Sequence, residues 1–319
     1  MSHSSDANFG FRIVGDCRND RRLIDWPSAF LAYCDCDDRA EVNSESYLSA
    51  FCFGAEFRDH MNQHGSPKGY IGPTCSTWLW FDIDHEDILD ATSDARKLAV
   101  SLIERYELAG DGLLIFFSGS KGYHIGLPTS LFNAELSVTY HAQSRKFAEA
   151  IAGWVGMTID SGVYDRVRAF RAPNSKHRKT GRHKRVLTLD ELLMLPPGRI
   201  IELAEKPEPF ELPALPGLHR QAVQDWQAAG EQVEQQQAIK FERGRAAKLN
   251  RSTRQFIVDG AATGDRHRTL FSAAANLAEF GCSFELAHAL LSEVALDSGL
   301  PPSEVRRQIQ CGLDRRPTT

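Results

Sequence analysis

The clearest alternation of apolar and polar residues in this chain is the run Trp-Leu-Trp-Phe-Asp-Ile-Asp that begins at residue 78. Successive side chains of an extended strand point to opposite faces. Leu79, Phe81 and Ile83 therefore share one face, which suits a core, and Asp82 and Asp84 project together from the other. The pattern predicts a strand that buries one face and presents two carboxylates on the other.

Apolar residues at helical spacing follow this strand, and a second such set occurs some fifty residues later. Between the two helical stretches, the apolar run 113–117 breaks into a turn with two glycines and then resumes as an alternating strand, which predicts a β-hairpin. Strand, helix, hairpin, helix and strand in this order predict an α+β fold with helices on one sheet face. The helical sets are Ile88, Ala91, Ala95, Leu98, Leu102 and Tyr106, and then Ala148, Ile151 and Val155.

The prolines near residue 210 mark a predicted domain boundary. Proline blocks both helix and strand pairing, so 206–217 is expected to be an extended linker. We predict a catalytic domain over 1–205 and a helical domain over 218–319. The latter would open with a long, mostly solvated helix rich in Gln, Ala and Glu, and continue as a small all-helical module with Leu270, Ala273, Ala274, Leu277 and Phe280 on one stripe.

Composition narrows the class without deciding the function. The chain has 319 residues, 42% hydrophobic and 25% charged, which is typical of a globular protein with two domains. No apolar run is long enough for a membrane span and the start does not resemble a secretory signal, so we expect a cytoplasmic protein without a membrane partner. A formal net charge of −5 argues against a protein that coats DNA nonspecifically and favours local contacts.

Two groups of residues suggest phosphate chemistry. Paired carboxylates are usually compensated by Mg²⁺ or Mn²⁺, although Asp82 and Asp84 also fit a solvated acidic turn. The hairpin turn offers hydroxyls, a glycine-freed backbone and Lys121, which suits phosphate oxygens, although an ordinary turn with an incidental lysine fits too. This turn is not a P-loop, and the chain contains no P-loop motif.

A third group begins at Asp160, where another carboxylate can join the pair. From Arg166 to Arg185 there are nine Lys or Arg residues and no Asp or Glu. Basic residues interleaved with aromatic ones suit polyphosphate or nucleic acid, with a solvated basic loop as the alternative. Seven cysteines raise the question of zinc, but no CxxC occurs, so free thiols are expected and zinc is not.

In this order the three groups resemble the archaeo-eukaryotic primase superfamily, and within it the primase-polymerases of plasmids, phages and integrative elements. The matching motifs are Asp82-Ile83-Asp84, then Ser118-Gly119-Ser120-Lys121-Gly122-Tyr123-His124, then Ile159-Asp160 with Phe170-Arg171-Ala172-Pro173-Asn174-Ser175. The resemblance covers roughly Glu45 to Leu195. It implies an RRM-like sheet with helices and a nucleotidyltransferase that uses two metal ions, Mg²⁺ or Mn²⁺.

The resemblance also implies residue roles. Asp82, Asp84 and Asp160 would be catalytic metal ligands. Ser118, Lys121, His124, Arg171 and Ser175 would bind the nucleotide. The basic residues that follow, Arg178, Lys179, Arg182 and Lys184, would contact nucleic-acid phosphates.

The leading hypothesis is a DNA-directed primase-polymerase that uses nucleoside triphosphates on single-stranded DNA template. A non-catalytic nucleic-acid-binding module of replication or defence is one alternative, and a metal-dependent nuclease is another. Because no Walker A motif occurs, a helicase partner would be a separate protein. Preference for ribo- or deoxynucleotides and the ability to start strands de novo are not encoded in any motif.

Overall fold

The computed structural model describes residues 7–245 and 249–314, except for the side chains from 240 to 245. The chain divides into two compact units, Met1–Gln235 and Gln236–Thr319. The division falls within a long helix rather than at 206–217, where the prolines predicted it. Each unit has a hydrophobic core of its own.

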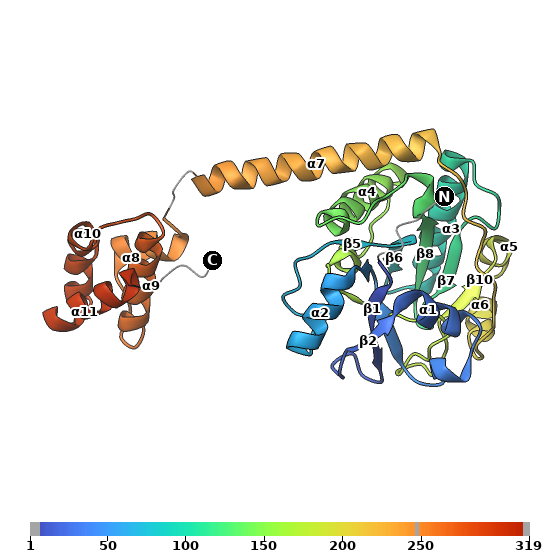
Figure 1. The fold of residues 1–319 in the computed structure, drawn as a ribbon, viewed down its shortest axis with the longest axis horizontal. Coiled ribbons are helices and arrows are strands. Elements are labelled where there is room, and N and C mark those ends of the chain that lie inside the picture. Colours follow the sequence, from blue (N-terminus) through green and yellow to red (C-terminus); the bar gives the residue numbers. More distant parts are fainter. Residues whose placement is uncertain (1–6, 246–248, 315–319) are drawn as a thin grey trace. The chain divides into compact units, whose positions relative to one another are not determined.

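The first unit is built on two antiparallel sheets (Figure 1). One has the strand order β5-β4-β1-β3-β9, with β2 also paired to β1, and the other has the order β10-β7-β8-β6. The strands are β1 (Phe9–Val14), β2 (Arg22–Asp25), β3 (Ser46–Ser49), β4 (Cys52–Phe53), β5 (Thr74–Cys75), β6 (Trp78–Asp84), β7 (Leu114–Phe117), β8 (Gly122–Pro128), β9 (Ala169–Arg171) and β10 (Arg185–Leu187). The predicted strand and hairpin are therefore β6 and β7–β8.

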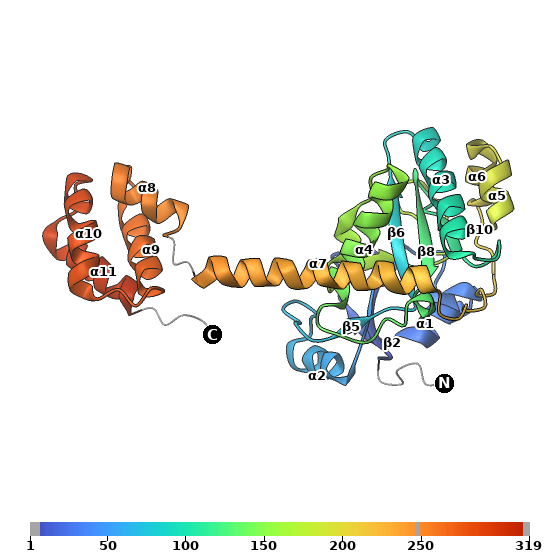
Figure 2. The ribbon, with the colours of Figure 1, turned by 90° about the horizontal axis from the view of Figure 1, so that it is seen from above.

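Helices pack on these sheets, which confirms the predicted α+β class. Helices α3 and α4 contact the β6–β8 region, and Figure 2 shows them beside these strands. They correspond to the two helices predicted from spacing. The helices of the first unit are α1 (Trp26–Cys34), α2 (Ala55–His64), α3 (Ile88–Tyr106), α4 (Tyr140–Val155), α5 (Leu189–Met194) and α6 (Pro197–Leu203), with short 3₁₀ turns η1 (Asp38–Ala40), η2 (Thr129–Leu131) and η3 (Ser161–Tyr164).

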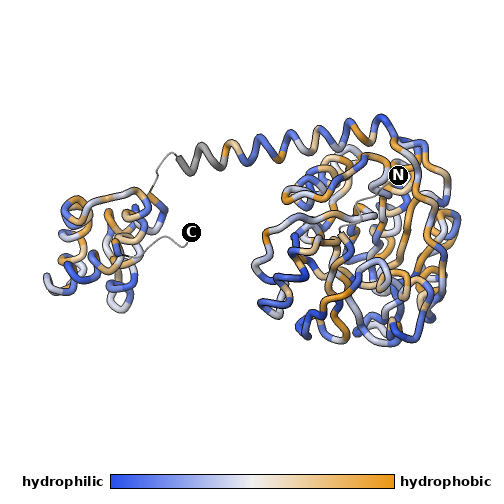
Figure 3. Tube along the Cα trace, in the orientation of Figure 1, coloured by the Kyte–Doolittle hydropathy of each residue, from blue (hydrophilic) through white to orange (hydrophobic). Residues whose placement is uncertain are grey.

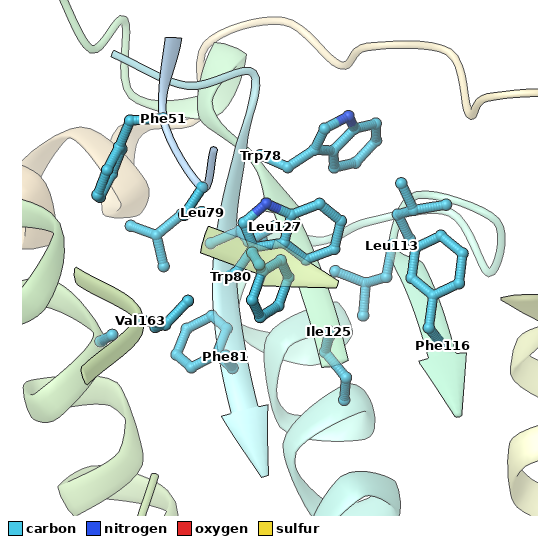
Figure 4. Packing of buried hydrophobic residues seen from close by; sticks show 14 of the residues in the cluster. Phe51, Trp78, Leu79, Trp80, Phe81, Leu113, Phe116, Ile125, Leu127 and Val163 are labelled. Atoms are coloured by element: carbon cyan, nitrogen blue, oxygen red, sulfur yellow. The ribbon is translucent and has the colours of Figure 1, made fainter. Parts of the chain in front are cut away.

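The core of the first unit follows the alternation read from the sequence. Phe81, Ile83 and Ile125 are fully buried on one face of the β6–β8 ladder. On the other face Trp80 lies 5.4 Å from Phe170 of β9, ring centre to ring centre, so the two sheets pack against each other. Figure 3 shows the central strands as mainly hydrophobic, and Figure 4 shows Trp80, Phe81 and Ile125 among the buried side chains in close-up.

Residues 206–217, called the strap from here on, form an extended segment, as predicted. The strap packs against the rest of the first unit. The Phe210 ring meets Phe116 edge to face at 5.5 Å, and its N–H donates to the carbonyl of Cys34 at 3.1 Å. Asn174, in the left-handed conformation with φ 56°, holds Glu208, two residues before Phe210. Its Nδ2 donates to the carbonyls of Tyr33 (2.9 Å) and Glu208 (3.0 Å), and its Oδ1 accepts from the Glu208 N–H at 3.0 Å.

The helix after the strap, α7 (Arg220–Arg245), corrects a second expectation. It was predicted to be mostly solvated, but its first half belongs to the core of the first unit. The ring of Trp226 is 9% exposed and stacks on Phe132 at 4.7 Å. Asp225 accepts hydrogen bonds of 2.8 Å from the Arg105 guanidinium and the Tyr106 hydroxyl. Burial opposes the ionised carboxylate, but these bonds outweigh it and lower the pKa of Asp225.

The second unit contains short helices around a small core. They are α8 (Arg251–Asp259), α9 (Arg266–Ala278), α10 (Phe284–Asp297) and α11 (Pro302–Leu313). Four members of the predicted stripe, Leu270, Ala273, Ala274 and Leu277, are buried on α9. The fifth, Phe280, lies after the end of α9 and is only partly buried. Across residues 7–245 and 249–314, none of the helices is both long and apolar enough to cross a membrane.

Candidate active site

Strand pairing brings the first two motifs together. In the antiparallel register of β6 and β8, Asp82 lies opposite His124 and Asp84 lies opposite Gly122. Glycine is required at this second pair, because a Cβ on Gly122 would stand 2.5 Å from the carbonyl oxygen of Ile83. The carboxylate strand and the returning strand of the hairpin are therefore direct neighbours, with their functional residues at the same end.

Asp160 approaches the same carboxylates from a separate segment. Its N–H donates to the carbonyl of Asp82 at 2.9 Å, and its own carboxylate accepts the N–H of Gly162 at 2.8 Å, which caps η3. Burial raises the pKa of Asp82 to about 7, and the negative charges of Asp160 and Asp84 add to this while Lys184 opposes it. The three carboxylates thus lie near one another, and ionisation of Asp82 is disfavoured.

The hairpin turn is held in a fixed shape. Ser118 Oγ accepts the N–H groups of Ser120 (3.4 Å) and Gly122 (3.2 Å). Gly119 has φ +85°, and a Cβ there would lie 3.0 Å from the carbonyl oxygen of His183, so the turn lies close against the basic loop 176–183. Thr180 Oγ1 donates to the carbonyl of Gly119 at 2.6 Å and joins the two segments.

One cavity of about 510 Å³ collects most of the predicted residues. It is open enough to admit a charged ligand from solvent, since Asp84 and Lys179 on its walls are exposed. The predicted residues that line it are Asp82, Asp84, Ser118, Lys121, His124, Arg171, Arg178 and Lys179. Asp160, Ser175, Arg182 and Lys184 do not belong to its lining.

Ser175 was predicted to bind nucleotide, but its side chain lies in the protein interior. Its side chain is completely buried. The hydroxyl donates to the carbonyls of Ala172 (2.8 Å) and Ser46 (3.1 Å). Ser175 therefore joins the motif to β3 and is not exposed to a ligand.

Lys184 was predicted to contact nucleic-acid phosphates, and its burial rules this out in the described conformation. The residue is 1% exposed, and its Nζ donates to the carbonyl of Arg171 at 2.9 Å. The ammonium lies 5.1, 4.6 and 4.4 Å from the ring centres of Trp80, Phe116 and Phe170. Such a cluster of rings stabilises a buried cation. Burial nevertheless lowers its pKa well below the ordinary value.

His124 lies at the cavity wall as a neutral base. Its Nε2 is 3.4 Å from Asp82 Oδ1, and its ring packs against Phe170 at 4.3 Å between centres. Burial, together with the charges of Lys184 and Arg171, holds the pKa of His124 well below its usual range. Its Nδ1 is buried without a hydrogen-bond partner among the described residues.

Residues ahead of the motifs complete the cavity, and sequence reasoning missed them. Pairing of β3 with β9 places Tyr47 opposite Arg171. Arg171 donates to Glu45 Oε1 at 3.4 Å, and the Tyr47 hydroxyl donates to the same oxygen at 2.7 Å. Both side chains of the Arg171–Glu45 pair are 13% exposed. The sequence offered no signal for this pair, because 126 residues separate its members.

A second arginine of the cavity is also paired with an upstream carboxylate. Arg178 Nη1 donates to Asp16 Oδ2 at 2.9 Å, and the two side chains are 69% and 41% exposed. Asp16 and its neighbour Cys17 line the cavity from the turn between β1 and β2. Arg182 lies on the same basic loop, and its N–H donates to Thr180 Oγ1 at 3.3 Å.

The donor chemistry at the carboxylates fits a hard divalent cation, although the described residues contain no closed metal-binding group of three or more His, Cys, Asp or Glu side chains. Burial raises the pKa of Asp82 first, and the negative charges of Asp160 and Asp84 raise it further. Asp84 lies on the same strand, β6, and Asp160 comes from a separate segment. The seven cysteines are free thiols.

Comparisons with known proteins add one match. No family model matches the chain, and no curated protein does. One solved structure, the crystal structure of primase RepB', aligns over 97% of this chain and 90% of its own with 14% sequence identity and a TM-score of 0.39. Similarity at this level shows neither a shared fold nor a shared function.

Proposed function

We propose that the protein is a DNA-directed primase-polymerase that adds nucleotides to a strand on single-stranded DNA template. The observation that carries the proposal is the 510 Å³ cavity, where the carboxylates of β6 and the phosphate-type hairpin turn face a set of basic side chains. Nucleotidyl transfer needs these components in one place. The order and spacing of the motifs, which resemble those of archaeo-eukaryotic primases, support the same assignment.

Asp82, Asp84 and Asp160 would hold two Mg²⁺ or Mn²⁺ ions. Bound there, the ions would activate the 3′-hydroxyl and neutralise charge on the leaving pyrophosphate. The protein's own contribution is to hold the carboxylates close together at the end of β6. His124, neutral and directly opposite Asp82, would orient a phosphate oxygen or its neighbouring carboxylate by hydrogen bonding rather than by charge.

Lys121 and Ser118 would bind the triphosphate from the hairpin turn, and Arg171 would stabilise it from β9. Arg178 and Lys179 would meet template or primer phosphates at the open side of the cavity, where Arg178 is exposed. Contacts of this kind raise affinity without selecting a sequence. Arg182 stays a proposed contact of the exposed basic loop, outside the cavity.

Primer extension tests the proposal. The purified protein, a primed single-stranded template, labelled nucleotides and Mn²⁺ or Mg²⁺ should give extended strands. Shortened strands would indicate a nuclease, and retention of DNA without any reaction would indicate a binding module.

Separate titrations of a non-hydrolysable nucleoside triphosphate and of single-stranded DNA test the hairpin. Lys121→Ala should weaken triphosphate binding by about 10- to 100-fold, since a charge-assisted phosphate contact is worth about 1.5–3 kcal/mol. DNA affinity should change little. Arg22→Ala, on an exposed strand away from the cavity lining, serves as the control for loss of a positive charge.

A further inference from the structure

A second groove lies away from the carboxylate cavity, along the edge strand β10. It has a volume of about 500 Å³ and is bounded by the loop before β7, by β10, by the start of α5 and by the strap. Its apolar wall consists of Leu113, Leu114, Val186, Leu189, Phe210 and Pro213. None of the residues in the proposed catalytic cavity lines this groove.

The groove exposes an unused backbone edge. β10 pairs only with β7, so its other side is free of strand partners. Lys184, just before β10, uses its outward N–H and C=O to bond Ser175 and Asn174. Outward-pointing backbone groups alternate along an antiparallel strand, so those of Val186 point to the same side. No described residue forms a backbone hydrogen bond with Val186 on that side.

The charges around the groove are mostly negative. Asp111, Asp190 and Glu211 are exposed at its rim, and no described residue forms an ion pair with any of them. The cation of the lining, Arg185, is 9% exposed and lies 3.3 Å from Glu208 Oε2. That approach lacks hydrogen-bond alignment, and the Nε and Nη1 groups of Arg185 are left without acceptors. These two donors lie buried beneath the groove without a hydrogen-bond partner among the described residues, so a carbonyl of a docked segment would reach them after a small shift of the Arg185 side chain.

We propose that this groove docks an extended, basic segment of a partner protein. The backbone of the segment would pair with Val186 as an added strand, and one of its carbonyls would accept from Arg185. An apolar side chain would contact Leu189 and Phe210, while lysine or arginine side chains meet the rim carboxylates. Nucleic acid does not fit, because the same carboxylates repel its phosphates.

Fluorescence anisotropy with the full-length protein tests this surface. The probe is the fluorescein-labelled peptide Lys-Arg-Val-Leu-Arg-Lys with an amidated end, and its counterpart has Glu in place of every basic residue. We expect saturable binding of the basic probe that weakens with added salt, and no binding of the acidic one. A copy of the basic probe that is N-methylated at alternate residues should bind at least tenfold more weakly, because it cannot pair with a strand edge.

Charge reversal on the protein separates this groove from general acidity. Asp111→Lys with Glu211→Lys should weaken the basic probe at least tenfold. Glu231→Lys with Glu234→Lys, on the exposed side of α7, makes the same charge change elsewhere and should leave binding within twofold. Circular dichroism would confirm that both double variants are folded.

Three results would overturn the proposal. These are no binding of the basic probe at millimolar protein, equal losses in the two double variants, and equal affinity of the methylated and unmethylated probes. A fourth result, saturable binding of a labelled single-stranded DNA oligonucleotide whose affinity changes in Asp111→Lys with Glu211→Lys but not in the α7 variant, would assign the surface to nucleic acid instead. None of these readouts depends on nucleotide transfer, so the proposal stands or falls separately from the catalytic one.

Discussion

On one side of the cavity stand Asp82 and Asp84, with Asp160 beside them, and no Lys or Arg of the described residues forms an ion pair with these three. On the other side Arg171 and Arg178 are each paired already, with Glu45 and with Asp16. The acidic side therefore has negative charge in excess, whereas both arginines on the basic side are already paired. A cation relieves the first side, while a phosphate that binds either arginine must compete with a carboxylate.

The largest expected effect lies on the acidic side. Asp82→Asn and Asp84→Asn should each lower primer extension by about 10³-fold, because each removes a charge that would hold the catalytic ions. Neither change should lower stability at pH 8, since each reduces repulsion among carboxylates. Extension rates and thermal melting measure the two effects. Extension near the wild-type rate in both variants would refute the two-metal assignment.

The next effect concerns stability and pH. The folded-state pKa of Asp82 is raised from 3.8 to about 7, so the folded protein binds an extra proton between these values. The stability that this proton supplies is fully present below about pH 4 and is lost as the pH rises through about 7. Wild type should therefore lose about 1–3 kcal/mol relative to Asp82→Asn between pH 5 and pH 8.

Denaturant unfolding of both proteins across this range measures the difference. Saturating Mn²⁺ at pH 8 should restore stability to wild type and give little to Asp82→Asn, since bound ligand stabilises the folded state. A constant difference between the two proteins across the pH range would show that Asp82 ionises normally.

The smallest effects lie on the basic side. Glu45→Gln should tighten binding of a non-hydrolysable triphosphate about fivefold, or about 1 kcal/mol, because it removes the charge that competes for Arg171. Asp16→Asn should change it less than twofold, since the Asp16–Arg178 pair is exposed and exposed pairs are weak. Calorimetric titration compares the two. Weaker binding in Glu45→Gln would mean that Glu45 positions Arg171 instead of competing for it.

The elements that the sequence predicted well are those whose signal is local. The alternation around Phe81 and Ile83 and the glycines of the hairpin predicted β6, β7 and β8. Their pairing then sets Asp82 opposite His124 without further information. The resemblance of motifs added Asp160, whose N–H is bonded to the strand that carries the pair.

The predictions that did not hold concern residues whose environment is set by distant segments. Lys184 sits in a run of basic residues that looks solvated, yet Trp80 and Phe116 from the second sheet surround its ammonium. Trp226 is one of two large aromatic residues in the sequence of a polar helix, and this could have indicated packing. Glu45 lies outside the motifs, and only the pairing of β3 with β9 brings it to Arg171.

The bonds of Asn174 to Tyr33 and Glu208 have a consequence for synthesis of the chain. A ribosome synthesises the chain from the N-terminus at about 5–20 residues per second, and folding begins before the C-terminal residues have been added. All three carboxylates that we propose to be catalytic have emerged well before Glu208 and Trp226. The nascent protein therefore carries its motifs for some seconds before the strap and α7 can complete the core around them. We expect the basic loop 176–183, which follows Asn174 closely in the chain, to reach its final position only after that.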